Sequence, residues 1–543
     1  MRKTALITVF DKGGIVEFAS SLVKLDWDII ASSGTAKLLN SEGVPARDVA
    51  ELTGSEPKFG HRVVTLSQEV HGGLMSRPIE EDIKELEKLG LPRIDLACIG
   101  FYPVAGEIAK PGATNESVTE MTDVGGPSAA HSAAKGSRIV VIDPKDRQRV
   151  IDQLRKYGHV LPETRRFFRA KADFLVSQYC MHTAEFHSNG IFTGMFLRLK
   201  SKMRKAENLN QNPAHLFSLG TDDPLALDRF TVLGNPGYVN ATGHHRSLEM
   251  MCLMAETFRA NFNGVPNIVI ACKHGNPCGV GIHWDSTTMG IMRAMLGNAK
   301  AVMGAEIMTN FYVGPEAARS LFTVSEDLRS RVKREKWGGD VIIAPGFSGE
   351  GTEILGKRER RHLLANPALV NPAFPPDEWA WRPVRGGMLR QKAPRFVFDL
   401  RNIEEQVGKD LNPVDLASVV IAFSVAWRAN SNTIALAKGG MLIGLCAGEQ
   451  DRRTAAEFAL LKAKKAGHDP RGSFFASDGF FPFAKRVDAG DELEATEMLA
   501  EAGCRGGIVP ADGRRLAEVK EFFKETEMTV FFVHPENRGF SQH

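Results

Sequence analysis

The stretch Ala5-Leu-Ile-Thr-Val-Phe-Asp-Lys-Gly-Gly14 joins an apolar run to a polar turn that contains two glycines. Residues 5–10 are typical of a buried strand, and the glycine pair begins a helix that is expected to reach Leu25. A second strand is expected over residues 28–31, with a helix from Gly34 onward. Short strands that alternate with helices predict a parallel sheet covered on both faces, and therefore an α/β fold.

The same alternation continues along the chain. Strands are expected at 94–104 and 138–142, with a helix at 126–135 between them. A second α/β part is expected to contain strands at 267–272, 340–344, 473–475, 507–509 and 529–533, a helix at 414–427, and a hairpin around Lys438-Gly-Gly440. We therefore predict a domain at 1–160, a helical linker at 161–205 and a second α/β region at 206–543. The basic run 200–205 is either a solvated linker face or a phosphate-contacting segment.

Composition restricts the class of protein. Hydrophobic residues make up 43% of the chain, charged residues 24%, and the net charge is only +3. Such a balance gives no overall attraction to nucleic acid or to a membrane, so neither is an expected partner. The longest apolar stretch, residues 416–427, is too short to cross a bilayer. The 7 cysteines form no Cys-x-x-Cys pair, which argues against a zinc ribbon or a disulfide framework and favours a cytoplasmic protein.

Two turns of the first domain could bind phosphate. Each follows a predicted strand at the carboxyl edge of the sheet, where ligands bind in such folds. Free amides at a helix N-terminus and a nearby lysine can hold an anion. Glycine turns are also common there for structural reasons, so the two segments are either a phosphate site or purely structural turns. The candidate substrate-binding residues are Lys12, Ser33, Gly34, Thr35 and Lys37.

A phenol, an acid and a lysine in the first domain form a second candidate group. Tyr102 follows a predicted strand, Asp123 precedes a helix of small residues, and Lys135 ends that helix. They are either a catalytic group at one sheet edge, or a buried ring, a helix cap and a surface charge.

The heptapeptide Lys273-His-Gly-Asn-Pro-Cys-Gly279 is the most specific motif of the second part. It places a cation and an imidazole at the end of a buried strand. Histidine can accept a proton near neutral pH, and lysine can stabilise an oxyanion or protonate a leaving nitrogen. Asn430-Ser-Asn432 either caps a turn or orients a reacting group. Residues 477–483 contain aromatic rings that either pack in the core or form a wall for a flat heterocycle.

Together these motifs resemble the bifunctional AICAR formyltransferase and IMP cyclohydrolase family, nearly from end to end. The heptapeptide, Ser431-Asn432 and Phe480-Phe-Pro-Phe483, in this order, carry most of the resemblance. It implies an N-terminal methylglyoxal-synthase-like parallel-sheet domain and a C-terminal formyltransferase region of two cytidine-deaminase-like subdomains without zinc.

The resemblance implies an enzyme of purine biosynthesis that uses AICAR and 10-formyltetrahydrofolate and then closes the ring to IMP. It also implies a homodimer whose formyltransferase site is shared between two chains, and it leaves a monovalent cation open. The implied catalytic residues are Lys273, His274 and Asn432 for formyl transfer, and Lys135, Asp123 and Tyr102 for ring closure. The implied substrate contacts are Asn240, Arg452, Phe480, Phe483 and Arg538, with Phe540 beside the last.

The chain also departs from the family pattern. Val64 and Ser67 stand where the family usually has a lysine and a histidine of the ring-closing site. An arginine and tyrosine are missing ahead of Asn212-Pro213, and Lys485 stands where an acid often meets the folate. Two alternatives therefore accompany the bifunctional enzyme: a formyltransferase with a degenerate cyclohydrolase domain, and a non-catalytic nucleotide-binding regulatory homologue.

Overall fold

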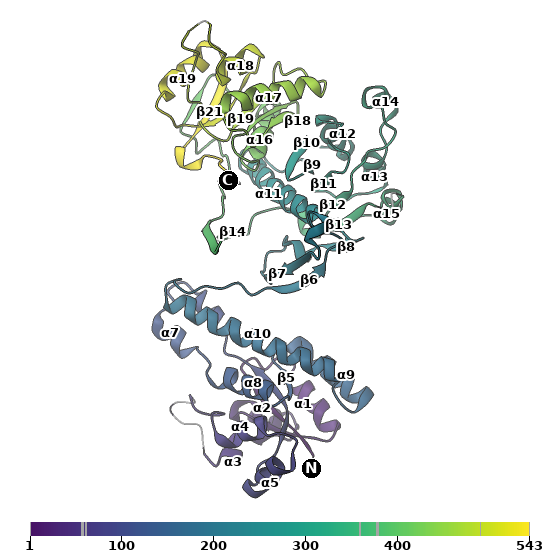
Figure 1. Ribbon diagram of the computed structural model, residues 1–543, viewed down its shortest axis with the longest axis vertical. Coiled ribbons are helices and arrows are strands. Elements are labelled where there is room, and N and C mark those ends of the chain that lie inside the picture. The colour runs from purple at the N-terminus through teal and green to yellow at the C-terminus, as the bar shows by residue number, and fades with distance from the viewer. Residues whose placement is uncertain are drawn as a thin grey trace. The chain divides into compact units, whose positions relative to one another are not determined.

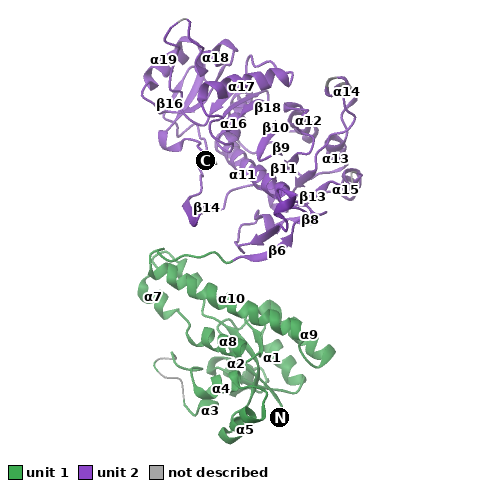
Figure 2. Ribbon diagram, viewed as in Figure 1, with its two compact units in different colours: residues 1–196 green, residues 197–543 purple. Residues whose placement is uncertain are grey.

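The computed structural model describes residues 2–55, 59, 62–357, 360–375, 379–488 and 490–541, and the chain forms two compact units, residues 1–196 and 197–543 (Figures 1 and 2). Each unit has its own sheet and its own hydrophobic clusters.

Unit 1 contains a five-stranded parallel sheet with strand order β3-β2-β1-β4-β5. Its strands are β1 (Lys3–Val9), β2 (Trp27–Ala31), β3 (Arg47–Asp48), β4 (Ile94–Gly100) and β5 (Ile139–Val141). Its helices are α1 (Ile15–Lys24), α2 (Ser33–Ser41), α3 (Val49–Thr53), α4 (Gln68–Met75), α5 (Glu80–Leu89), α6 (Val104–Ile108), α7 (Asn115–Glu120), α8 (Gly125–Lys135), α9 (Arg147–Tyr157) and α10 (Pro162–His187).

Alternation along β1 explains why both faces of this sheet are covered. Ala5 and Ile7 pack in a cluster with α1 and α9, whereas Leu6 packs in a second cluster with α4 and α8. Successive side chains of a strand point to opposite faces, so an apolar run requires helices on both sides. The expected strand at 94–104 is shorter in the structure, because β4 ends at Gly100 and α6 begins at Val104.

The segment 161–205, expected to be a helical linker, contains α10 and β6. Helix α10 packs against α8 and β5, and Lys171 Nζ lies 2.7 Å from carboxylate oxygens of both Asp143 and Asp146. The compact units divide between residues 196 and 197. Helix α10 is therefore part of the first unit.

Unit 2 contains a twelve-stranded mixed sheet with order β16-β21-β20-β19-β17-β18-β10-β9-β11-β12-β13-β8. The strands of unit 2 are β6 (Arg198–Lys202), β7 (His215–Ser218), β8 (Thr231–Leu233), β9 (Asn267–Lys273), β10 (Asn276–His283), β11 (Glu306–Thr309), β12 (Val341–Ala344), β13 (His362–Ala365), β14 (Trp379–Val384), β15 (Gly387–Lys392), β16 (Glu405–Val407), β17 (Ile434–Lys438), β18 (Met441–Cys446), β19 (Phe474–Ser477), β20 (Gly506–Pro510) and β21 (Thr529–Val533). Of these, β6 pairs with β7 and β14 with β15 in two separate two-stranded sheets. Its helices are α11 (Tyr238–Asn261), α12 (Thr287–Gly297), α13 (Pro315–Phe322), α14 (Glu326–Val332), α15 (Gly349–Gly356), α16 (Pro413–Ala426), α17 (Arg452–Lys465), α18 (Ala495–Glu501) and α19 (Leu516–Glu525).

Two halves of this sheet meet where β10 pairs with β18, at Gly281 and Met441. Helices α11 and α16 share one large cluster on one face (Figure 1), while α12 with α13, and α17 with α19, form separate clusters with the alternate strand residues. Residues 416–426 of helix α16 are buried on all sides, as expected for a helix that is apolar all round. The observed folds of both units confirm the α/β prediction.

The hairpin expected around Lys438-Gly-Gly440 is present as β17 and β18. Among the described residues, no helix is both long and apolar enough to cross a membrane. All seven cysteines are free, and five of them are buried.

Candidate active sites

A cavity of about 630 Å³ lies at the carboxyl ends of the unit 1 strands. Five of its lining residues were predicted from the sequence: Lys12, Ser33, Gly34, Tyr102 and Asp123. They meet there because β1, β2 and β4 are parallel, so the loops that follow these strands converge at one edge.

Lys12 supplies a cation at the base of this cavity. Its Nζ donates hydrogen bonds to Thr35 Oγ1 at 2.9 Å and to the carbonyl of Val9. Burial lowers the pKa of Lys12, and the neighbouring Asp11 opposes this shift. Thr35 is buried behind the cavity, where it fixes the lysine. Lys37, by contrast, is exposed on α2 and does not line the cavity.

Asp123 is held at the cavity by its own loop and by α10. Its Oδ1 accepts a hydrogen bond from the Gly126 amide at 2.8 Å, and its own amide donates to the Tyr179 hydroxyl at 2.7 Å. A Cβ on Gly126 would lie 2.4 Å from Asp123 Oδ2, so this position requires glycine. Burial raises the pKa of Asp123. The sequence analysis missed Tyr179, which carries no motif of its own.

Lys135 does not reach the other two members of its predicted group. It is exposed at the last position of α8, an 11-residue helix that begins just after Asp123. At 1.5 Å per residue, the two ends of this helix lie about 15 Å apart. Tyr102 and Asp123 line the cavity together, and Lys135 does not.

The two departures in this domain have different consequences. Val64 lines the cavity, so an aliphatic side chain stands at the site itself. Ser67 instead caps α4, because its Oγ accepts a hydrogen bond from the Val70 amide at 3.3 Å. Arg62 also lines the cavity and forms an ion pair with Glu120.

In unit 2, strand register brings the predicted motifs to one edge of the large sheet. The turn between β9 and β10 lies at the edge where β18 ends, because β10 and β18 are antiparallel. Ile434, the first residue of β17, pairs with Cys446 at the end of β18 and with Ser477 at the end of β19. The heptapeptide, Asn430–Asn432 and Ser477–Asp478 therefore share this edge, although they are far apart in sequence.

His274 lies at the tip of a tight hairpin turn. Lys273 pairs with Asn276, and the two residues between them, His274 and Gly275, have φ values of 53° and 75°. Two positive φ values in a two-residue loop are typical of a type I′ turn, which glycine and asparagine favour. The turn leaves the His274 side chain exposed at the sheet edge.

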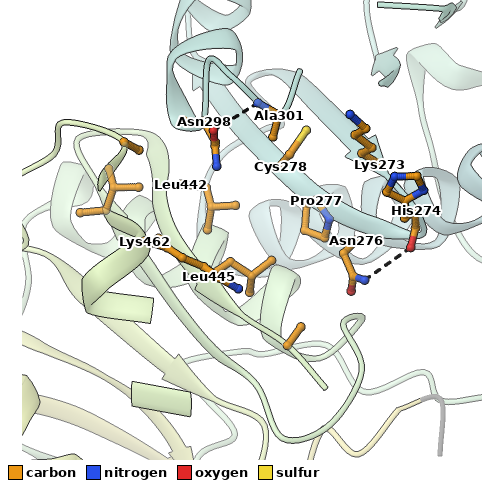
Figure 3. Close-up of a pocket in the computed structure, with 15 residues that line it drawn as sticks. Lys273, His274, Asn276, Pro277, Cys278, Asn298, Ala301, Leu442, Leu445 and Lys462 are labelled. Atoms are coloured by element: carbon orange, nitrogen blue, oxygen red, sulfur yellow. Dashed lines mark hydrogen bonds between the residues drawn. The ribbon is translucent and has the colours of Figure 1, made fainter. Parts of the chain in front are cut away.

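Lys273 and His274 line a cavity of about 290 Å³ together with Asn276, Cys278, Leu442 and Lys462 (Figure 3). Lys273 Nζ donates a hydrogen bond to the carbonyl of Met303 at 2.8 Å. Asn276 Oδ1 is buried and has no hydrogen-bond partner among the described residues. The cavity therefore contains a cation that a bound molecule could use, beside a buried acceptor.

Asn432 is anchored by a buried ion pair. Its Oδ1 accepts a hydrogen bond from Arg452 Nη2 at 2.6 Å, and its Nδ2 donates to the carbonyl of Glu449 at 3.0 Å. Arg452 pairs with Asp478, and these residues are 7% and 0% exposed. The Thr433 amide donates to Asp478 Oδ1 at 2.7 Å. Arg452, predicted as a substrate contact, thus holds Asn432 in place.

The aromatic segment after Asp478 divides between core and surface. Phe481 is buried with Phe475 and Phe523, whereas Phe483 is 40% exposed beneath Arg515. The Phe480 ring lies beside Gly513, where an added Cβ would approach within 2.6 Å of it.

The predicted residues near the end of the chain, and Lys485, lie at the surface of this unit. Arg538 stacks on Phe540, 5.2 Å from the ring centre, and lies 3.6 Å from Asp512. Lys485 donates to Glu525 at 2.5 Å on the surface, so this family departure is engaged in an ion pair.

Asn240, predicted as a substrate contact, is bound to a carboxyl group that the sequence analysis missed. Its Nδ2 donates to Glu306 Oε1 at 3.0 Å, and its Oδ1 accepts from the Gly237 amide at 3.0 Å. Asn240 also lines a cavity of about 310 Å³ next to His244. Glu306 begins β11 and is only 2% exposed, and burial raises its pKa to about 7. The sequence signal that could have identified Glu306 is a charged residue within an otherwise apolar strand.

We expect Glu306→Gln to change how stability depends on pH. The carboxyl group has a pKa of about 7 in the folded protein, above its ordinary value of 4.5. Its contribution to the stability of the folded protein is therefore fully present below pH 4.5 and is lost as the pH rises through 7. Glutamine does not titrate. As the pH rises from 4.5 to 8, the free energy of unfolding of the variant should increase by roughly 3 kcal/mol relative to that of the original protein. Urea denaturation across this range measures the difference, and a pH-independent difference would contradict it.

Comparison with known proteins shows the family to which the chain belongs. A family model described as AICARFT/IMPCHase bienzyme matches residues 133–462, and a model of the MGS-like domain matches residues 14–128. A solved structure titled "Crystal structure of ForH" is 32% identical, covers 35% of this chain and 98% of its own, and has a TM-score of 0.32.

Curated relatives match over nearly the whole chain. A "Bifunctional purine biosynthesis protein PurH" of Thermoanaerobacter sp. is 30% identical over 539 residues, which cover 96% of this chain and 98% of the relative. Proteins of the same name from Neisseria gonorrhoeae and Anoxybacillus flavithermus are 31% and 29% identical; they cover 95% and 93% of this chain, and 95% and 94% of their own lengths. The protein therefore belongs to the AICARFT/IMPCHase bienzyme family of purine biosynthesis.

Proposed function

We propose that unit 2 transfers a formyl group from 10-formyltetrahydrofolate to AICAR at the sheet edge that carries His274. The observation that supports this most is the exposed imidazole on a tight turn, at the same edge as Asn432 and its Arg452–Asp478 anchor. The functional division follows the predicted domains, with formyl transfer in 206–543 and any ring closure in 1–160.

The chemistry needs a base and an acid. The exocyclic amine of AICAR attacks the formyl carbon, a C–N bond forms, and negative charge develops on the formyl oxygen. The bond from that carbon to the folate nitrogen then breaks, which yields formyl-AICAR and tetrahydrofolate. His274 accepts the amine proton, and Lys273 delivers a proton to the departing nitrogen. Asn432 orients the reacting groups from its anchored position.

The test is turnover of the purified full-length protein with AICAR and 10-formyltetrahydrofolate, followed as tetrahydrofolate release. Supplying a separate cyclohydrolase removes the product, so an unfavourable equilibrium cannot hide activity. No turnover under these conditions, together with binding of AICAR, would favour the regulatory homologue.

Ring closure at the unit 1 cavity is a second proposed activity, which uses Tyr102 and Asp123. Val64 places no charge where a cation would assist the nucleotide. We expect the original protein to convert formyl-AICAR to IMP slowly, and Val64→Lys to raise this rate by at least about tenfold, because a hydrogen bond to a charged group contributes about 1.5–3 kcal/mol. Formation of IMP from formyl-AICAR alone measures it. Val487→Lys, an exposed valine in unit 2, is the matched control, and equal rates in the original protein and Val64→Lys would refute the role of residue 64.

A homodimer is part of the proposal. Strands β14 and β15 form a two-stranded sheet of their own, and Val384, Met388 and Leu389 on it are exposed. Because an isolated two-stranded hairpin is only marginally stable in water, a second copy of the chain would stabilise it by packing against these side chains. Analytical ultracentrifugation tests this state.

We also propose that unit 2 binds a monovalent cation and that the protein is cytoplasmic. Asp478 Oδ2 is buried and has no hydrogen-bond partner among the described residues, which supports a cation near the Asn432 anchor. Dependence of turnover on potassium rather than on a bulky organic cation would support it.

A further inference from the structure

Arg246 lies between two parts of the proposed formyl transfer site, the turn that carries His274 and the segment that carries Asn432. It projects from α11 across the His274–Gly275 turn: a Cβ placed on Gly275 would lie 3.6 Å from Arg246 Cγ and 3.7 Å from its Nε. Its Nη2 donates a hydrogen bond to Asn430 Oδ1 at 3.1 Å. One side chain thus lies beside the turn that carries His274 and is hydrogen-bonded to the segment that carries Asn432.

The Arg246 guanidinium has capacity for a further partner. It carries five N–H donors, and the contact with Asn430 uses one of them. Its partner is a neutral amide, and among the described residues no carboxylate lies within ion-pair distance of it. Glu249 and Cys272 lie near it, and Arg382 adds a like charge. A half-buried guanidinium without an anionic partner favours an incoming anion.

We propose that Arg246 is a substrate-binding residue of the formyl transfer site, where its guanidinium binds an anionic oxygen of the reacting complex next to His274. This inference rests on the proposed function. The chemistry has two sources of such an oxygen. One is the phosphate of AICAR, which is present before reaction, and the other is the formyl oxygen, which gains negative charge as the amine attacks.

Substrate pairs distinguish these sources. We would measure kcat and KM for the original protein, Arg246→Gln and Arg246→Lys, with AICAR and with its dephosphorylated riboside. A phosphate contact predicts a rise in KM for AICAR that disappears with the riboside. A contact to the formyl oxygen predicts a fall in kcat of about 10²–10³-fold with both substrates. Arg246→Lys should restore little of the original KM or kcat, because lysine lacks the planar fork of arginine.

Two further variants make the test specific. Asn430→Ala removes the partner of Arg246 and should reproduce part of its kinetic defect, with the same dependence on the substrate phosphate. Arg319→Gln removes a surface guanidinium that pairs with Glu350 on another part of the same unit, and it should leave both constants unchanged.

The outcomes separate the two claims. If the original protein turns over and both Arg246 variants stay within threefold of it with both substrates, only the role of Arg246 is overturned. If the original protein does not turn over, the proposed function and the inference fall together. Unchanged circular dichroism and melting temperature of the variants exclude a folding defect as the cause.

Discussion

Replacing His274 by asparagine is expected to lower kcat for formyl transfer by about 10²–10⁴-fold, the usual contribution of a general base. Stability should stay the same or rise. His274 and Gly275 occupy the two positive-φ positions of the β9–β10 turn, and asparagine followed by glycine is the preferred pair for such a turn. Asparagine thus removes the imidazole and keeps the backbone. Tetrahydrofolate release and thermal unfolding measure the two effects.

Alanine would be a poorer substitution at this position, because a residue with φ of 53° is strained unless it is glycine or asparagine. The matched control is His245→Asn, which changes an exposed histidine of α11 and should preserve turnover. Near-normal turnover in His274→Asn would remove the proposed base from the mechanism.

Replacing Asp478 by alanine is expected to lower the free energy of unfolding of unit 2 by about 3–5 kcal/mol, because it leaves Arg452 buried without its counter-charge. Both residues are almost inaccessible, and Asp478 also accepts the Thr433 amide. The Asn432 anchor should loosen as well, so formyl transfer should fall with stability. Urea denaturation and turnover measure these effects.

A double variant separates stability from function. Arg452→Met with Asp478→Leu removes both charges and should recover much of the lost stability, since apolar replacement of a buried pair is often tolerated. Turnover should stay low, because Asn432 still lacks its donor. Glu525→Ala breaks the exposed pair with Lys485 and should cost less than about 1 kcal/mol. A similar small loss in Asp478→Ala would contradict the anchoring role.

The positions of Tyr102, Asp123 and Lys135 depend on the geometry of the elements that carry them. Tyr102 and Asp123 follow strands or precede a helix at the ligand-binding edge, so both line the cavity. Lys135 belongs to the same motif string, but a helix of eleven residues carries it to the other end. Ser67 stands where the family usually has a histidine, and in the structure it caps α4.

Local sequence determined the elements of this protein. Apolar runs bounded by glycine turns specified strands and helices, and the family motifs specified which loops carry chemistry, because both depend on neighbours along the chain. Only the tertiary structure decided which of those loops meet. The approach of Arg246 to Asn430, of Glu306 to Asn240 and of Tyr179 to Asp123 joins residues 184, 66 and 56 positions apart. Strand order and the packing of helices on the sheets fix such contacts, and neither is written in any single segment of sequence.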